Sequence, residues 1–278
     1  MIVVTGATGT VGRRVIDLLL QIGQKVTAIT RNPATAALPN GVQVVYGDPS
    51  RPETLRPALD GVEAVLLSPR AAGNATTRLL ALAADLRRVV VLSAATVEFP
   101  VGHPRFHAHF RAVEDAVRTA GPQWTFLRCA DFAANALAWA PQIRATGIVR
   151  GAYGAAATSP VHQRDIAEVA VRALLDAEHA GHSYVLTGPQ SLTQGDKVRV
   201  IGSAIGRELT FQEISPEQVR RGMLAQGLPE EIPDRLLGSL ADYAVRAGPT
   251  TDTVERLLGR PALTFADWAA DHAAAFRA

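Results

Sequence analysis

The sequence predicts an α/β fold with a doubly wound parallel sheet, followed by a smaller, mainly helical C-terminal part. Three observations support this fold class. Short apolar runs alternate with helical patterns through the first 128 residues, and a glycine-rich loop joins the first run to the first helix. Most of the apolar runs are continuous, as in strands that helices cover on both faces. Alternation of this kind requires right-handed crossovers between parallel strands.

Six strands are expected in this part of the chain, at Met1–Thr5, Lys25–Thr30, Val42–Tyr46, Ala64–Leu67, Val89–Ser93 and Trp124–Arg128. Between them, amphipathic or polar stretches predict helices at Val11–Ile22, Thr54–Leu59, Asn74–Asp85 and Phe106–Ala120.

The pattern changes after Arg128, where the strand and helix signals become less regular. Strands are predicted at Ile148–Tyr153, Tyr184–Leu186 and Leu209–Ile214, and helices at Phe132–Ile143, from an N-cap at Asp165 to Ala177, from Ser191 or Thr193 to Gly206, and from Ser215-Pro216 onward. About the last 60 residues are expected to be mainly helical.

Composition limits the function classes. The chain of 278 residues is 47% hydrophobic, its net charge is +2, and its basic residues are scattered rather than clustered with aromatics. We therefore expect a small-molecule substrate, no nucleic-acid or membrane partner, and a monomer or homodimer. No apolar run reaches about 18 residues, no signal peptide is recognisable, and Cys129 is the single cysteine. These features favour a cytoplasmic protein without a disulfide framework.

The strongest motif is the loop Gly6-Ala7-Thr8-Gly9-Thr10-Val11-Gly12, which follows a buried strand and opens a helix. Gly6 permits the tight turn, Gly9 lets a phosphate approach the backbone, and Gly12 allows the helix to pack closely on the strand. The free amides at Thr8, Thr10 and Val11 then face a pyrophosphate at the positive end of the helix dipole. The loop predicts a Rossmann fold that binds a dinucleotide.

We therefore expect residues 1–150, with strand 183–188 added, to form an NAD(P)-binding domain, and residues 151–278 to form an intertwined substrate-binding cap.

The second strand ends with Arg31, and no carboxylate stands where NAD-specific proteins hold the ribose hydroxyls. Arg31 suits a 2′-phosphate, so NADP(H) is favoured over NAD(H), although a solvated turn arginine is the alternative. Asp48, after the third strand, is either an adenine contact or the N-cap of the next helix. Leu67 and Ser68 end the fourth strand, where the nicotinamide ribose is expected to pass.

The usual proton relay of short-chain dehydrogenases, Tyr-x-x-x-Lys, is absent from the sequence, because no tyrosine has lysine four residues later. Candidate proton donors are His107 and His109, on the helix that normally carries this pair; surface or structural histidines are the alternative. The spacing of these residues and His103 does not match a zinc site, so we expect no metal.

At this point the sequence resembles the NmrA-like, NAD(P)H-binding group of atypical short-chain dehydrogenases. The resemblance rests on the glycine loop and on further segments along nearly the whole chain: Gly47-Asp48, Leu92-Ser93-Ala94, Glu114, Trp124–Asn135, Asp165-Ile166-Ala167, Tyr184–Pro189, Leu257–Pro261 and Trp268. Two positions depart from the pattern, namely Phe110, where lysine or histidine is common, and Cys129, where proline is common.

The resemblance implies an NADPH-dependent oxidoreductase that passes hydride to a small conjugated or quinone-like substrate. Ser93 is the one residue at a usual catalytic position, and Ser93 and Ala94 are also expected beside the cofactor. The predicted substrate pocket comprises Thr96, Cys129, Phe132, Asn135, Trp139 and His162. Two alternatives remain open: a non-catalytic NADP(H)-sensing regulatory protein, and a cyclase or isomerase that uses the same fold without net redox change.

Overall fold

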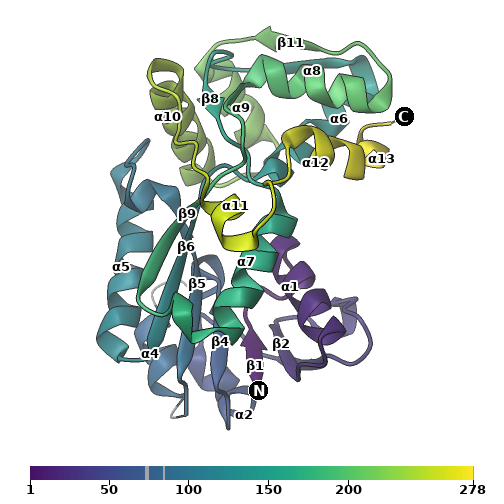
Figure 1. Cartoon of the computed structure of the whole chain (residues 1–278). Coiled ribbons are helices and arrows are strands. Elements are labelled where there is room, and N and C mark those ends of the chain that lie inside the picture. Colours follow the sequence, from purple (N-terminus) through teal and green to yellow (C-terminus); the bar gives the residue numbers. More distant parts are fainter. Residues whose placement is uncertain (73–74, 84, 278) are drawn as a thin grey trace. The chain divides into compact units, whose positions relative to one another are not determined.

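The computed structural model describes residues 1–72, 75–83 and 85–277 (Figure 1). Contacts divide the chain into two units that alternate along the sequence. The first unit comprises residues 1–97, 108–129 and 163–185, and the second comprises residues 98–107, 130–162 and 186–278. The predicted division near residue 150 separates a cofactor-binding part from a substrate-binding part, and this division of roles stays a prediction.

The first unit is built on a sheet of seven strands in the order β3-β2-β1-β4-β5-β6-β9. Their bounds are β1 Ile2–Val4, β2 Val26–Thr30, β3 Gln43–Tyr46, β4 Ala64–Leu67, β5 Arg88–Ala94, β6 Gln123–Cys129 and β9 His182–Leu186. Each neighbouring pair from β3 to β6 is parallel. The strand order reverses direction between β1 and β4, which confirms the doubly wound α/β prediction. In sheets of this type, ligands bind at the carboxyl ends of the strands beside the reversal.

Helices cover this sheet on both faces, as continuous apolar strands require (Figure 1). On one face, Val65, Val89 and Phe126 pack with Leu79 of α4 and Val113 of α5 in one apolar cluster. On the other face, α1 packs against α7, which also contacts β4, β5 and β6. The helices of this unit are α1 Thr10–Gln21, α2 Arg56–Leu59, α3 Pro69–Ala72, α4 Thr76–Ala81, α5 Pro104–Ala120, whose first residues lie in the second unit, and α7 Gln163–Leu175, with short 3-10 turns η1 Pro33–Thr35, η2 Pro52–Leu55, η4 Ala95–Val97 and η6 Ala177–His179.

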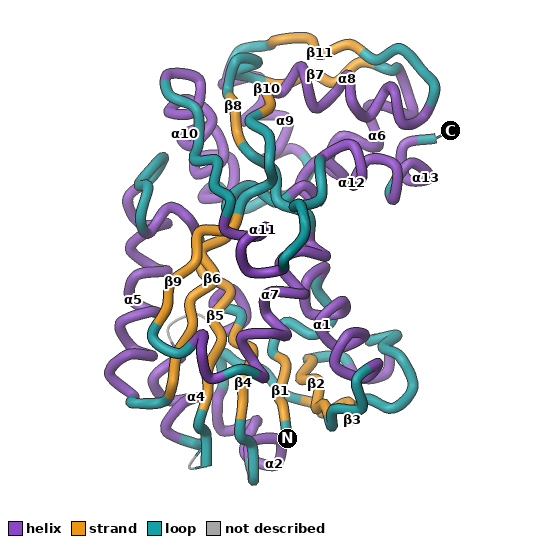
Figure 2. Tube along the Cα trace, viewed as in Figure 1, coloured by secondary structure: helices purple, strands orange, loops and turns teal. Residues whose placement is uncertain are grey.

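The second unit is mainly helical and contains two small sheets (Figure 2). In these, β10 pairs antiparallel with β8 and β11 pairs parallel with β7. Its core gathers Ile143, Val198, Ile201, Trp268 and Phe276, all fully buried. The elements are η5 Ala133–Trp139, α6 Ala140–Thr146, β7 Ile148–Gly151, β8 Ala157–Thr158, β10 Leu192–Thr193, α8 Gln194–Ile205, β11 Thr210–Glu213, α9 Pro216–Ala225, α10 Glu231–Val245, α11 Thr253–Leu258, α12 Phe265–Asp271 and α13 Ala273–Phe276.

Capping residues set several of these helix ends. Thr193, Ser215 and Thr264 each form a capping box with the residue three positions later. Gly206 ends α8 in the left-handed conformation, with φ of +69°. The predicted starts of α8 and α9 and the helical C-terminus are therefore confirmed.

Several predicted elements differ in the structure. The helix predicted at Thr54–Leu59 divides into η2 and α2. Asp165 is not an N-cap, because α7 already begins at Gln163 and Asp165 lies buried in its first turn. The helix predicted at Phe132–Ile143 divides into a 3-10 helix and α6, since Pro141 has no N–H with which to continue an α-helical ladder. The helix predicted at Asn74–Asp85 is shorter, and positions 74 and 84 lie outside the described residues.

Within the described part of the chain, no helix is long and apolar enough to cross a membrane.

Candidate nucleotide-binding site

The glycine loop is closely packed at two of its three glycines. Gly6 has a φ of +65°, a conformation that favours glycine, and a Cβ there would lie 3.0 Å from Cβ of Ser68. A Cβ on Gly12 would lie 2.3 Å from the carbonyl oxygen of Gly6, so α1 can approach the loop only with glycine at this position. The Gly9 amide donates a hydrogen bond of 2.9 Å to the same oxygen and closes the turn.

The loop leads directly into the N-terminus of α1, where Gly9 is the N-cap. The first amides of a helix have no acceptor within the helix, and Gly9 has no side chain that would occupy them. Thr8, Gly9 and Thr10 are exposed, whereas Val11 is buried. These residues therefore fit a pyrophosphate, which would accept from the amides and interact favourably with the helix dipole.

A threonine links the two strands between which the strand order reverses. The Thr5 hydroxyl donates to the Leu66 carbonyl at 3.0 Å and accepts from the Ser68 amide at 2.8 Å. This pair of bonds joins the carboxyl ends of β1 and β4, where the strand order reverses. Ser68 thus lies against Gly6 at the loop, while Leu67 is fully buried in the sheet.

The residues predicted to select the cofactor lie at the ends of the next two strands. Arg31 follows β2 and is exposed. Asp48 is not the N-cap of the following helix, since Arg51 occupies the N-cap position of η2. Its carboxylate instead accepts from the Ser50 hydroxyl at 2.7 Å and the Ser50 amide at 3.0 Å. These bonds, with smaller effects of Arg31 and Arg51, lower the pKa of Asp48, so it carries a negative charge at neutral pH.

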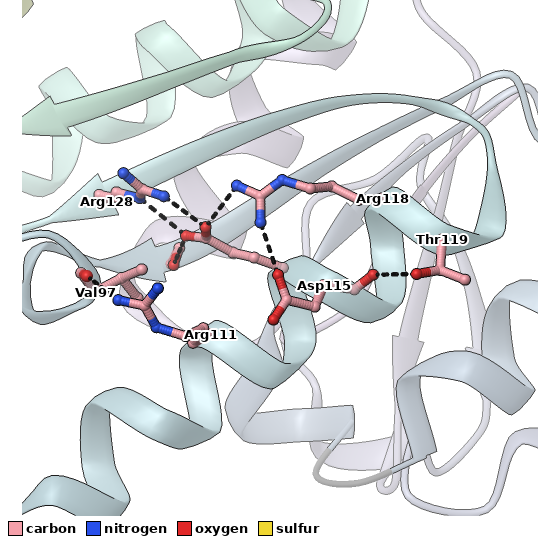
Figure 3. A network of polar contacts seen from close by, with 8 residues as sticks. Val97, Arg111, Asp115, Arg118, Thr119 and Arg128 are labelled. Carbon is pink, nitrogen blue, oxygen red and sulfur yellow. Dashed lines mark hydrogen bonds and ion pairs between the residues drawn. The ribbon is translucent and has the colours of Figure 1, made fainter.

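Ser93 belongs to an ion-pair network centred on the buried Glu114 of α5. Figure 3 shows this network with Arg118 and Arg128 labelled. Glu114 is fully buried, and its carboxylate accepts from the Ser93 hydroxyl at 2.7 Å. Arg128 of β6 donates to both carboxylate oxygens, at 3.0 and 2.7 Å, and Arg118 adds a contact of 3.2 Å. The Ser93 proton therefore points to Glu114, and the network joins β5, β6 and α5 at one end of the sheet.

The two candidate proton donors are half-buried on α5. The ring of His109 makes an edge contact with Phe110, with the ring centroids 5.6 Å apart. Phe110 itself is buried, which accounts for an apolar residue at this position of the helix. Tyr243 does not offer an acidic hydroxyl instead, because burial and then Asp131 and Asp242 raise its pKa to about 12.

The predicted substrate residues are divided between the units. Thr96 and Cys129 lie in the first unit, and both are buried. Phe132, Asn135, Trp139 and His162 lie in the second unit. Burial raises the pKa of the Cys129 thiol, so a nucleophilic thiolate is disfavoured there. The substrate pocket remains a prediction.

The second unit holds a buried lysine that the sequence did not single out. The Lys197 ammonium donates to Asp131 at 2.8 Å and to Thr158 at 2.6 Å, and Thr158 donates to the same carboxylate at 2.7 Å. Asn135, a predicted pocket residue, donates to the other oxygen of Asp131 at 2.9 Å. The sequence offered one indication that Lys197 is special, namely that the chain has only two lysines. Among the described residues, no cluster of three histidine, cysteine or acidic side chains could hold a metal ion.

Comparisons with known proteins agree with this geometry. A family model described as NAD(P)H-binding matches residues 6–177, which include the glycine loop, Arg31, the Ser93 network and all of α7. The chain belongs to this NAD(P)H-binding family. As a member of the atypical short-chain dehydrogenase group of such proteins, it is an oxidoreductase, and the loop residues described above fit the pyrophosphate of its cofactor.

Several relatives of this NAD(P)H-binding protein match along their full length. A (4-alkanoyl-5-oxo-2,5-dihydrofuran-3-yl)methyl phosphate reductase of Streptomyces griseus is 38% identical, with 99% of both chains covered. An NAD(P)H azoreductase of Xenophilus azovorans is 35% identical, with both chains covered completely. The structure of an NADPH-dependent quinone oxidoreductase of Escherichia coli complexed with NADPH has a TM-score of 0.82 and 26% identity, and covers 98% of this chain and 99% of that one.

Proposed function

We propose that this protein is an NADPH-dependent reductase that transfers hydride to a small conjugated or quinone-like acceptor. One observation carries the cofactor half of this proposal: a glycine loop that fits the pyrophosphate follows β1, and Arg31, rather than a carboxylate, follows β2. The guanidinium of arginine can donate two parallel hydrogen bonds to a phosphate, whereas a ribose hydroxyl cannot accept such a pair.

The names of the relatives support the substrate class. Their substrates are a quinone, an azo compound and a dihydrofuranone whose ring double bond is conjugated with two carbonyl groups. Each has a double bond that electron-withdrawing groups make receptive to hydride. When bound, the reduced nicotinamide supplies the hydride, and a proton from a side chain or from water completes the two-electron reduction.

The chain's own residues bind the cofactor, orient it and contribute to protonation of the reduced substrate. The loop and the N-terminus of α1 hold the pyrophosphate, and Ser68 lies beside Gly6 on the path toward the nicotinamide. Ser93 keeps the end of β5 in place through Glu114, whereas the proton comes from water, His107 or His109. An acceptor such as a quinone accumulates negative charge on oxygen and readily takes a proton from water, so no tyrosine–lysine pair is required.

Cofactor titrations test the first half of the proposal. Wild type is expected to bind NADPH more tightly than NADH, and Arg31→Asp should reduce or reverse this preference. Loss of one charged hydrogen bond of about 1.5–3 kcal/mol corresponds to about ten- to 150-fold in NADPH affinity. Arg56→Asp, an exposed charge change on α2, should leave both affinities unchanged. Equal binding of the two cofactors by wild type would refute the preference.

Turnover assays test the second half. NADPH consumption should be rapid with a naphthoquinone, an azo dye or a conjugated furanone, and negligible with an unconjugated ketone. Tight NADPH binding without any turnover would instead favour a cofactor sensor, and product formation without NADPH loss would favour an isomerase.

The same assay identifies the proton donor. A histidine donates only when protonated, so a rate that depends on it falls as the pH rises. His107→Gln or His109→Gln should remove this dependence if that side chain is the donor, with His103→Gln as the control at the exposed position just before α5. Unchanged turnover and pH profiles in both variants would leave water as the proton source.

A further inference from the structure

Arg13, one residue after the last glycine of the loop, makes three hydrogen bonds to backbone carbonyls. Its Nε donates to the Thr8 carbonyl at 3.0 Å, its Nη1 to Ala37 at 2.7 Å and its Nη2 to Ala36 at 2.6 Å. Thr8 belongs to the glycine loop, whereas Ala36 and Ala37 lie in the segment after β2, more than 20 positions away in sequence. One guanidinium therefore ties the two parts of the nucleotide site together.

The segment after β2 has little else to hold it. Of residues 31–40, only Ala36 is buried and Leu38 is half-buried, so the apolar core contributes little. The turn η1 is closed by bonds within the segment itself, such as Ala36 to Pro33. Among the residues that the structure describes, Arg13 is the side chain that donates hydrogen bonds to the backbone of residues 33–40.

Ala37, in the anchored segment, has a backbone conformation that alanine disfavours. Its φ of +47° lies in the left-handed region, which alanine disfavours because of its Cβ. A residue keeps such a conformation only when surrounding contacts stabilise it. Here the Ala37 carbonyl accepts the 2.7 Å bond from Arg13.

Arg31 lies between two fixed points of this backbone. On its N-terminal side, Thr30 pairs with Tyr46 at the end of β2. On its C-terminal side, the carbonyls of Ala36 and Ala37 are held by Arg13. Arg13 uses donors on all three of its nitrogens for backbone carbonyls, one in the glycine loop and two in this segment, whereas Arg31 is exposed toward solvent.

We propose that Arg13 is a positioning residue for cofactor choice. It fixes the segment after β2 against the glycine loop, and thereby holds Arg31 where the 2′-phosphate of NADPH binds. This inference rests on the proposed preference for NADPH through Arg31. It predicts that Arg13 acts on NADPH affinity through Arg31 and not as a phosphate ligand itself.

The test is a double-mutant cycle measured by calorimetric titration with NADPH and NADH. Arg13→Met keeps the apolar stem and removes the donors, and Arg14→Met is the matched control, because Arg14 is the next residue of α1 and is exposed. We expect Arg13→Met to weaken NADPH binding about fivefold to tenfold. NADH binding should change less than about twofold, as should both affinities in Arg14→Met.

In the double variant Arg13→Met/Arg31→Ala, NADPH affinity should equal that of Arg31→Ala within about twofold, since Arg13 acts through Arg31. Additive losses would overturn the inference, because Arg13 would then contact the phosphate directly. Equal losses for NADPH and NADH would also overturn it, since Arg13 would then support the glycine loop as a whole.

Amide hydrogen exchange of residues 33–38 gives a readout that needs no cofactor. Exchange should be faster in Arg13→Met than in wild type or Arg14→Met, and Arg13→Lys, which keeps the charge but lacks the forked donors, should lie between. Unchanged exchange in Arg13→Met would refute the anchoring. If wild type shows no preference for NADPH and Arg31→Ala leaves NADPH affinity unchanged, the proposed cofactor choice is refuted, and with it the specificity role of Arg13. If wild type prefers NADPH but Arg13→Met leaves NADPH affinity unchanged, only the inference about Arg13 is refuted.

Discussion

Replacing Glu114 with glutamine should strongly destabilise the first unit. Glu114 is fully buried, and Arg128, whose side chain is 14% exposed, donates to both of its oxygens. Two unit charges about 4 Å apart attract by about 4 kcal/mol at an effective dielectric constant near 20. Glutamine keeps the shape and one acceptor but removes the negative charge that both contacts of Arg128 with this side chain use. We expect Glu114→Gln to reduce the free energy of unfolding by about 3 kcal/mol.

The neighbouring residue supplies the control. Asp115 also pairs with Arg118, at 2.9 Å, but its side chain is 61% exposed. Asp115→Asn should therefore cost less than about 1 kcal/mol, although it removes the same charge from the same helix.

Urea unfolding followed by fluorescence and circular dichroism measures both variants. Trp124 reports on the first unit, because it stacks on Phe126 with ring centroids 4.3 Å apart and Arg118 lies over its ring. If the Glu114 variant loses no more stability than the Asp115 variant, burial does not explain a large contribution of the Glu114–Arg128 pair to the free energy of unfolding, and the reasoning is refuted.

Three further outcomes are expected. Gly9→Val, whose Cβ would already lie 3.1 Å from the Gly6 carbonyl oxygen, should lose more than about tenfold in NADPH affinity while its circular dichroism stays that of wild type. Lys197→Met should reduce the free energy of unfolding by about 3 kcal/mol at neutral pH. Burial raises the pKa of Asp131, but Lys197 outweighs this effect and holds that pKa below its usual value, so the stability that the pair gives to wild type should be lost as the pH falls below about 4. Acid unfolding curves should therefore show a weaker loss of stability in the variant than in wild type. Cys129 should react with a thiol reagent only after unfolding, because burial raises its pKa; rapid labelling of the native protein would contradict this.

Local patterns were sufficient to predict most of the fold. Buried parallel strands have a distinctive composition, and capping residues such as Thr193 and Ser215 act within four positions of the helices they start. The glycine loop could likewise be identified, because its turn and its contact with α1 involve residues six positions apart.

The interactions missed from the sequence join distant segments. Arg13 contacts carbonyls 23 and 24 positions away, and backbone carbonyls leave no trace in residue identity. Lys197 reaches Asp131 across 66 positions, so neither partner reveals the other. Ser93 was singled out as a catalytic candidate, but its bond to Glu114 depends on how α5 lies on the sheet. Pairings of this kind follow from the packing of elements, which periodicity does not encode.

The chain's return to the sheet at residue 163 has a consequence for folding during synthesis. α7 lies against α1 and contacts three central strands, and its buried side chains include Ile166, Val169 and Ala170. Until residues 163–175 have left the ribosome, that apolar face of the sheet has no α7 to cover it, although the glycine loop emerges before α7. The sheet is thus completed well after its glycine loop has been translated, and nascent chains that stall before α7 are the ones expected to need a chaperone.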